Sequence, residues 1–214
     1  MNIDLSIIIP CHNAESYIKQ NLDSILFQKT EYKFEVIFIC DKCEDYTHEY
    51  INGYLKDTYI NYKIFDSNYG CPGLPRNVGI KNSIGEYIVF IDDDDCIISD
   101  SYITKILDFI KKSNSPIIRF GYENNSLDKW YWSMVWQYCY KRDFIKDYLF
   151  DNTIGTEDVN FNNFVFGRLG FKKLNWNGMR CENFVPYLDE ELYYYNFPRV
   201  GSVLYNMNAN INNK

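Results

Sequence analysis

The feature that most restricts the possible folds of this sequence is a series of short runs rich in β-branched residues. These runs alternate with helical patterns. The runs lie within the first hundred residues and are apolar on both faces; they are Ser6–Ile9, Phe34–Cys40, Tyr62–Phe65 and Tyr87–Ile91. Strands of this kind, separated by helices, are typical of a parallel sheet that helices cover on both sides. The sequence therefore predicts an α/β fold in which ligands bind beyond the carboxyl ends of the strands.

Polar and conformationally special residues predict where the intervening helices begin and end. Asn13 is expected to cap the first helix, and Asp45 is expected to cap the second. Pro75 suits the first position of a third helix. Gly85 lies where the end of that helix needs a left-handed residue.

The pattern changes after about Tyr102, where one more amphipathic helix, a strand at Ile117–Phe120 and an aromatic-rich segment follow. Aromatic residues or Met recur at every second position from Trp130 to Tyr140, which is strand periodicity. These side chains suit the core and a ligand-binding cleft equally well. Since no repeat or flexible linker interrupts the chain, we predict a single domain over residues 1–214.

Composition sets limits on partners and compartment. With 46% hydrophobic and 24% charged residues, the chain suits one globular domain, and its net charge of -7 argues against a nucleic-acid partner. The apolar runs fall short of the ~18 residues of a membrane span. The first residues also lack the features of a secretory signal. We therefore expect no membrane span and a cytoplasmic protein whose seven cysteines stay reduced.

Four adjacent carboxylates, from Asp92 to Asp95, follow the last of these strands. Their repulsion is poorly screened at the end of a buried strand unless a cation or protons relieve it. A Mg²⁺ or Mn²⁺ site is the favoured interpretation, because hard cations prefer oxygen ligands, and a solvated acidic turn is the alternative. An EF-hand loop is excluded, because Ile97 and Ile103 stand where that loop needs Gly and Glu.

Six segments in order resemble glycosyltransferase family 2. They are Ser6–Glu15, Gly70–Ile80, Gly85–Asp95, Trp136–Ile145, Thr156–Asp158 and Tyr193–Val203. The resemblance covers nearly the whole chain and implies the GT-A fold, a Rossmann-like, mostly parallel sheet flanked by helices. Residues 1–100 would form the nucleotide-sugar-binding half and residues 101–214 the acceptor-binding half. The implied activity is an inverting transfer from a nucleotide diphosphate sugar, usually a UDP sugar, to a carbohydrate or glycoconjugate acceptor, assisted by Mn²⁺ or Mg²⁺.

The resemblance also carries roles onto single residues. Asp92 and Asp94 fill the two carboxylate places of a DxD-type metal motif, and Asp158 takes the place of the catalytic base. The positions expected to bind the nucleotide sugar are Pro10, His12, Asn13, Glu15, Asp41, Arg76, Asp92 and Asp93. Of these, His12 would stack on the base, while Asp41 and Arg76 would form hydrogen bonds with it.

Two departures from the family pattern affect the site. Cys40–Asp45 replaces the usual acidic turn that contains Gly and Ser. The chain has only two histidines, so no late histidine can complete the metal site. Phosphate oxygens, water, or a late carboxylate such as Asp189 or Glu190 must then fill the remaining positions.

Other functions have separate support. Cys40-x-x-Cys43 between a strand and a helix suggests a thiol redox protein, but that function explains neither the aspartate run nor the Gly-Cys-Pro-Gly loop. A zinc site would need further ligands such as Cys11, Cys71 and Cys96, and ordinary reduced thiols are favoured over it. A non-catalytic carbohydrate-binding protein is a third possibility, against which the intact aspartate run argues.

Overall fold

An eight-stranded sheet organises the computed structural model, which describes residues 2–124, 134–170 and 185–196. The strands are β1 (Leu5–Cys11), β2 (Phe34–Asp41), β3 (Tyr62–Ser67), β4 (Tyr87–Phe90), β5 (Cys96–Ile97), β6 (Ile117–Asn124), β7 (Tyr138–Lys141) and β8 (Tyr187–Tyr195). Their order across the sheet is β3-β2-β1-β4-β7-β6-β8-β5. The four strands from the start of the chain pair in parallel, whereas β7 is antiparallel to both β4 and β6.

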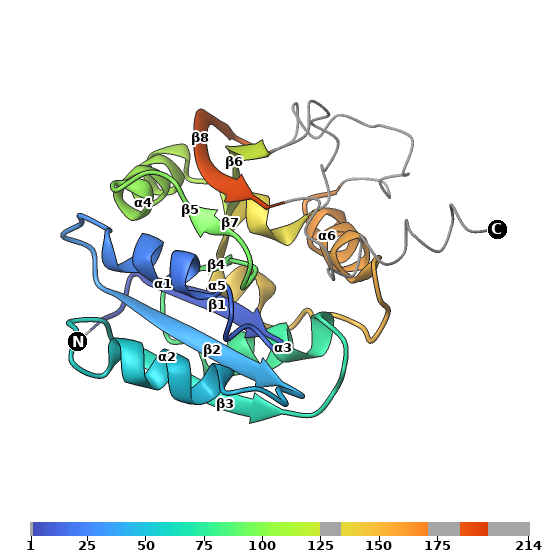
Figure 1. Ribbon diagram of the computed structural model, residues 1–214. Helices are drawn as coiled ribbons and strands as arrows, with labels where there is room; N and C mark the ends of the chain where they lie inside the picture. Colours follow the sequence, from blue (N-terminus) through green and yellow to red (C-terminus); the bar gives the residue numbers. More distant parts are fainter. Residues whose placement is uncertain (1, 125–133, 171–184, 197–214) are drawn as a thin grey trace.

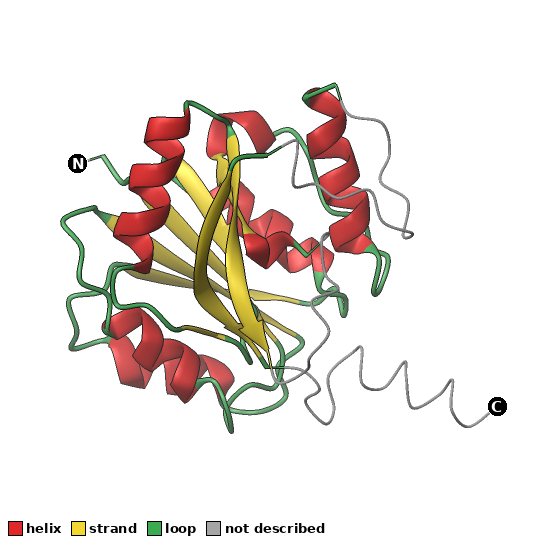
Figure 2. Ribbon diagram, turned by 90° about the horizontal axis from the view of Figure 1, so that it is seen from above, coloured by secondary structure: helices red, strands yellow, loops and turns green. Residues whose placement is uncertain are grey.

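Helices cover both faces of this sheet (Figures 1 and 2). They are α1 (Lys19–Leu26), α2 (Thr47–Leu55), α3 (Gly73–Asn82), α4 (Tyr102–Ser113), α5 (Arg142–Ile145) and α6 (Glu157–Arg168), with a short 3-10 helix at Val135–Gln137. Apolar residues of α1, α2 and α4 form one core with one face of the sheet, and those of α3, α5 and α6 form a second core with the other. The arrangement confirms the predicted α/β fold with helices on both sides.

The predicted strands are present, and the first three extend one or two residues beyond the predicted ends. Pro10 lies inside β1 and pairs in register with Ile39 of β2. Both faces of β1 and β2 are buried almost throughout, as the apolar runs indicate. No helix in the described part of the chain is both long enough and apolar enough to cross a membrane.

The predicted caps are wrong at three positions. Asn13 does not cap α1, which begins six residues later; it has a left-handed backbone (φ 50°), and its Oδ1 accepts the Glu44 N–H at 2.7 Å. Pro75 is the third residue of α3 rather than the first. Gly85 is not left-handed; α3 ends at Asn82, and the next residue, Ser83, already has an extended backbone (φ -76°, ψ 142°). A Cβ at Gly85 would lie 2.5 Å from the Ser6 backbone nitrogen, so a larger residue would force the backbone of β1 to shift.

Asp45 does act at the start of α2, although Tyr46 stands between it and the helix. Its Oδ1 accepts the backbone N–H of Thr47, the first residue of α2, at 3.1 Å. The predicted aromatic strand is shorter than expected, because Val135–Gln137 is a 3-10 helix and β7 begins only at Tyr138. Trp136, Tyr138 and Tyr140 are buried in the core, while positions 130 to 133 lie outside the described residues.

Candidate active site

Hydrogen bonds connect the loops at the carboxyl ends of β1, β2 and β4. They involve residues that the sequence predicts to bind the nucleotide sugar. The His12 backbone N–H donates to Asp93 Oδ2 at 2.9 Å, and the His12 ring nitrogen Nδ1 lies 2.7 Å from the Asp41 carbonyl oxygen. Because a carbonyl only accepts, His12 carries its proton on Nδ1 in this arrangement. Glu15 Oε2 in turn accepts the Tyr46 N–H at 3.1 Å. The loops after β1, β2 and β4 are thus joined at one edge, as the parallel sheet predicts.

The Asp41 carboxylate organises the segment that follows β3. It accepts hydrogen bonds from the Ser67 hydroxyl at 2.8 Å and from the backbone N–H groups of Tyr69 and Gly70, each at 2.7 Å. Gly70 has a left-handed backbone (φ 73°), which glycine adopts without steric cost. Asp41 is only 5% exposed, so its present partners already use much of its accepting capacity.

Arg76 lies at the centre of a buried cluster of carboxylates. Its Nη2 is 2.6 Å from Asp92 Oδ1, and its Nη1 is 3.3 Å from Asp158 Oδ1 and 3.6 Å from Glu157 Oε1. Burial alone would lower the pKa of the guanidinium, but the three carboxylates raise it above its usual value. Arg76 is 3% exposed and therefore acts first as the counter-ion of these acids.

Asp158 is held in this cluster from two sides. Its Oδ1 faces Arg76, and its Oδ2 accepts the Val135 backbone N–H at 3.0 Å. Burial is the main cause that raises the pKa of Asp158 to about 7; Arg76 opposes this effect, and the charges of Glu157 and Asp92 contribute to it. A carboxyl group that titrates near neutral pH can serve as a general base. Glu157 Oε2, buried beside it, has no hydrogen-bond partner among the described residues.

The four aspartates of the run lie in two different environments. Asp92, Asp93 and Asp94 are half-buried, whereas Asp95 is 1% exposed. Asp95 accepts the Tyr193 hydroxyl at 2.6 Å and the Asn196 backbone N–H at 2.8 Å. Burial raises the pKa of Asp95 well above its usual value, and the charges of Asp92 and Asp94 add to that effect. Asp95 thus fastens the end of β8 to the aspartate turn.

Sequence reasoning missed the part that Tyr193 plays here. Its hydroxyl also accepts the Asp92 backbone N–H at 3.2 Å, and its ring stacks on Trp136 with centroids 4.8 Å apart. Tyr193 lies between Trp136 and the aspartates because β8 pairs with β5 and β6. A local sequence pattern does not predict this long-range pairing. The late carboxylate Glu190 pairs with Lys105 of α4 at 2.5 Å instead of standing ready as a metal ligand.

The thiols of Cys40 and Cys43 do not have the character of a redox pair. A hydrogen bond with Cys11 raises the pKa of Cys40, and a hydrogen bond with Cys40, followed by burial, raises the pKa of Cys43. The attacking thiol of such a pair works as a thiolate, which a lowered pKa favours. The raised pKa values of both thiols therefore argue against the alternative redox function.

Comparisons with known proteins identify the family and the fold of the chain. The family model described as Glycosyl transferase family 2 matches residues 6–193. The poly(ribitol-phosphate) beta-N-acetylglucosaminyltransferase TarS of Staphylococcus aureus (strain Mu50) is 34% identical over 116 residues, which are 53% of this chain and 20% of that protein. The chain therefore spans about a fifth of the length of this relative.

Solved structures share the fold. The crystal structure of S. aureus TarS 1-349 in complex with UDP superposes with a TM-score of 0.74 at 24% identity, covering 91% of this chain and 60% of that one. The mannosyltransferase PcManGT from Pyrobaculum calidifontis, in complex with GDP-Man and Mn²⁺, gives a TM-score of 0.70 at 14% identity, covering 94% of this chain and 59% of that one. Both structural similarities show a shared fold. The match to the family model extends from β1 into β8. The chain therefore belongs to glycosyltransferase family 2.

Proposed function

We propose that this chain transfers a sugar from a nucleotide diphosphate donor, most suitably a UDP sugar, to a carbohydrate or glycoconjugate acceptor with inversion. The observation that carries the proposal is the cluster around Arg76, in which Asp158 is buried with a raised pKa beside the aspartate turn. The similarity to TarS, whose structure was determined with UDP, supports a UDP donor.

The donor would lie against the loops after β1, β2 and β4. His12 and Asn13 are exposed at this edge, and Asp93 already holds the His12 backbone. His12 would make the main contact with the base, because Asp41 is buried and already accepts three hydrogen bonds. Glu15 and Asp92 would contact the ribose, and Pro10 lies next to the last residue of β1. Arg76 would contribute mainly by balancing Asp92, because its guanidinium is buried.

A divalent cation would relieve the excess negative charge of the acids at this edge. Three carboxylates lie within 3.6 Å of the single Arg76 guanidinium, so negative charge is in excess even before Asp93 and Asp94 are counted. Asp92 and Asp94 offer the hard oxygen ligands that Mn²⁺ and Mg²⁺ prefer. When bound there, the ion would supply Lewis-acid neutralisation of the diphosphate leaving group.

Asp158 would perform the proton transfer. The acceptor oxygen forms a bond to the anomeric carbon while the bond from that carbon to the diphosphate oxygen breaks, and the acceptor's proton passes to the Asp158 carboxylate. Attack from the face opposite the leaving group inverts the configuration. The contacts from Arg76 and the Val135 N–H would fix the direction in which this carboxylate accepts the proton.

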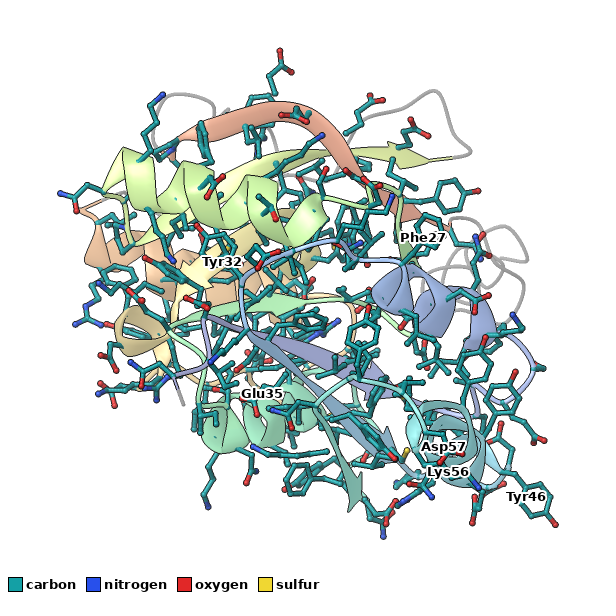
Figure 3. The ribbon with its side chains drawn as sticks, turned by 90° about the vertical axis from the view of Figure 1, so that its left-hand side faces the viewer. Phe27, Tyr32, Glu35, Tyr46, Lys56 and Asp57 are labelled. Carbon is teal, nitrogen blue, oxygen red and sulfur yellow. The ribbon has the colours of Figure 1, made fainter. Side chains whose placement is uncertain are left out.

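Nucleotide binding tests the donor site and the cation together. We expect UDP or a related nucleotide to raise the melting temperature more with Mn²⁺ than with a chelator, because only the folded state binds the pair. Asp94→Ala should lose the Mn²⁺-dependent part of the affinity in calorimetry while the fold stays intact. The matched control is Asp57→Ala, which removes an exposed carboxylate beyond the end of α2 (Figure 3).

Equal nucleotide affinity with Mn²⁺ and with excess chelator would refute the cation assignment. The same preparations distinguish an enzyme from a non-catalytic carbohydrate-binding protein. A panel of nucleotide sugars identifies the donor that stabilises the protein, and release of the nucleotide from that donor over time indicates turnover. Stable binding without any release would favour the binding protein instead.

A further inference from the structure

A second group of side chains, separate from the aspartate turn, has the ligand types of a transition-metal site. Among residues 2–124, 134–170 and 185–196, the Cys40 Sγ, a His48 ring nitrogen and a carboxylate oxygen of Asp66 all lie within 4.8 Å of one another. A thiol, an imidazole and a carboxylate are together the usual ligands of zinc in proteins. The proposed sugar transfer assigns no role to any of the three.

The fold brings these residues together through strand register. Cys11 pairs with Cys40, and Cys40 pairs with Asp66, so the three stand in one row across β1, β2 and β3. Residues at matching positions of neighbouring strands point to the same face of a sheet. His48 comes from the first turn of α2, whose apolar residues share a core with Cys11 and Cys40 on that face (Figure 1).

One further thiol, that of Cys43, lies against this row. The Cys40 thiol is in hydrogen-bonding contact with both Cys11 and Cys43. The Cys43 Sγ lies 3.6 Å from the Cys11 carbonyl oxygen. The sequence Cys40-x-x-Cys43 followed by His48 also has the close ligand spacing found in structural zinc sites. The local group therefore offers three ligands that are already close together, with a further thiol nearby.

We propose that Cys40, His48 and Asp66 bind a divalent transition metal of the zinc class, with the fourth position open to water or to Cys43 after a rotation of its side chain. Thiolate and imidazole ligands select such ions over Mg²⁺ and Mn²⁺, so this site differs in chemistry from the carboxylates of Asp92 and Asp94. A bound ion would join the ends of β2 and β3 to the start of α2, next to the loops that carry His12 and Asp41.

The required adjustment is small and falls on exposed groups. Around a tetrahedral zinc ion, neighbouring sulfur and nitrogen ligands stand about 3.5 Å apart, given bonds of about 2.3 Å and 2.0 Å. His48 and Asp66 are already 2.9 Å apart, with side chains 40% and 72% exposed. They can rotate towards the buried Cys40 thiol, and the same exposure gives the ion a path of entry.

Titration with Co²⁺ tests the site without nucleotide, sugar or turnover. Reduced, metal-stripped protein should bind one Co²⁺ per chain and develop the near-ultraviolet band of a cobalt–thiolate bond together with tetrahedral visible bands, and Zn²⁺ should remove both. We expect Cys40→Ser and His48→Gln each to weaken this binding by at least about tenfold. The control Cys96→Ser, which removes a thiol of β5, should bind as the wild type does.

A cobalt complex without the thiolate band, or unchanged affinity in His48→Gln, would overturn the proposal. His48→Gln keeps the test decisive if the buried Cys40→Ser variant does not fold, because the His48 side chain is 40% exposed. Since the readout involves neither Mn²⁺ nor a donor sugar, its failure would leave the proposed sugar transfer standing, and the reverse also holds.

Discussion

Arg76 and Asp158 show how much of the chemistry rests on single residues. Arg76 is a single buried cation in contact with three acids, Asp92, Glu157 and Asp158. Burial raises the pKa of Asp158. The sequence could predict Asp158 from the resemblance of its motif, and it predicted Arg76 as a ligand of the base. It could not predict that the two residues, 82 positions apart, would form a pair. Such pairing depends on how α3 and α6 meet.

The raised pKa of Asp158 has a consequence for stability. Its pKa lies near 7 in the folded state and near its ordinary value of 3.8 in the unfolded chain, so the folded state binds the proton more tightly. This contribution to the free energy of unfolding is present below about pH 4 and is lost as the pH rises towards 7. Asp158→Asn removes it, because Asn does not titrate.

We therefore expect Asp158→Asn to gain stability relative to the wild type as the pH is raised from 4 to 7. Urea unfolding of both proteins at several pH values measures the difference. Glu31→Gln, at an exposed carboxyl group, serves as the control and should follow the wild type. Parallel stability curves for Asp158→Asn and the wild type would contradict the raised pKa.

At the scale of elements, the strands were predictable and the caps were not. Runs that are apolar on both faces can only be buried strands here, so their position follows from composition alone. Asn13, which follows β1, serves a neighbouring loop instead of its own helix, because its side chain accepts the Glu44 N–H, whereas Asp45 does act at the start of α2. Capping propensity describes only the interaction of a residue with its own helix. At the carboxyl ends of the strands, hydrogen bonds between loops override that propensity.

Two glycines provide a matched test of how β1 approaches the α3–β4 turn. A Cβ at Gly85 would lie 2.5 Å from the Ser6 nitrogen and 2.7 Å from the Leu5 carbonyl carbon, both of which are backbone atoms. A Cβ at Gly53, within α2, would meet nothing within 4 Å. We expect Gly85→Ala to lower the free energy of unfolding by about 1–3 kcal/mol. Gly53→Ala should raise it by roughly 0.5–1 kcal/mol, because Ala favours helices.

Thermal or urea unfolding of the two variants checks both signs. If Gly85→Ala were as stable as the wild type, the close approach of β1 would be wrong. The Gly53 variant excludes a general effect of adding a methyl group.

Glu35 (Figure 3) is the second residue of β2, so it lies at the opposite end of the strand from the candidate site. It is fully buried, accepts the Ser6 hydroxyl at 2.7 Å and the Ile84 N–H at 2.8 Å, and pairs with Lys63 at 2.8 Å. Glu35→Ala leaves these donors without their acceptor, so we expect a loss of about 3 kcal/mol in the free energy of unfolding.

Nucleotide affinity separates this structural role from a role in the site. It should be unchanged in folded Glu35→Ala, measured by calorimetry at a temperature well below its melting point. Glu31→Ala, at an exposed position, is the matched control for stability. A weaker nucleotide complex in folded Glu35→Ala would show that the two ends of the strand are coupled.

At the scale of the whole molecule, the candidate site draws on both predicted halves of the chain. Arg76 and Asp92 come from the first hundred residues, whereas Asp158 and the Val135 N–H come from the second half. The single sheet makes this possible, because β7 joins the parallel strands through β4. The order of strands beyond β4 follows from long-range pairing and was not predictable from local sequence.

The measurement closest to the central claim is the turnover of Asp158→Asn. With the donor that stabilises the protein and saturating Mn²⁺, we expect its kcat to fall by about 100- to 10,000-fold, because Asn cannot accept a proton. Donor affinity and melting temperature, measured on the same preparation, should show a folded protein that still binds nucleotide, and Glu157→Gln should lose less activity. Near-normal turnover in a folded Asp158→Asn variant would contradict the account and point to Glu157 as the base.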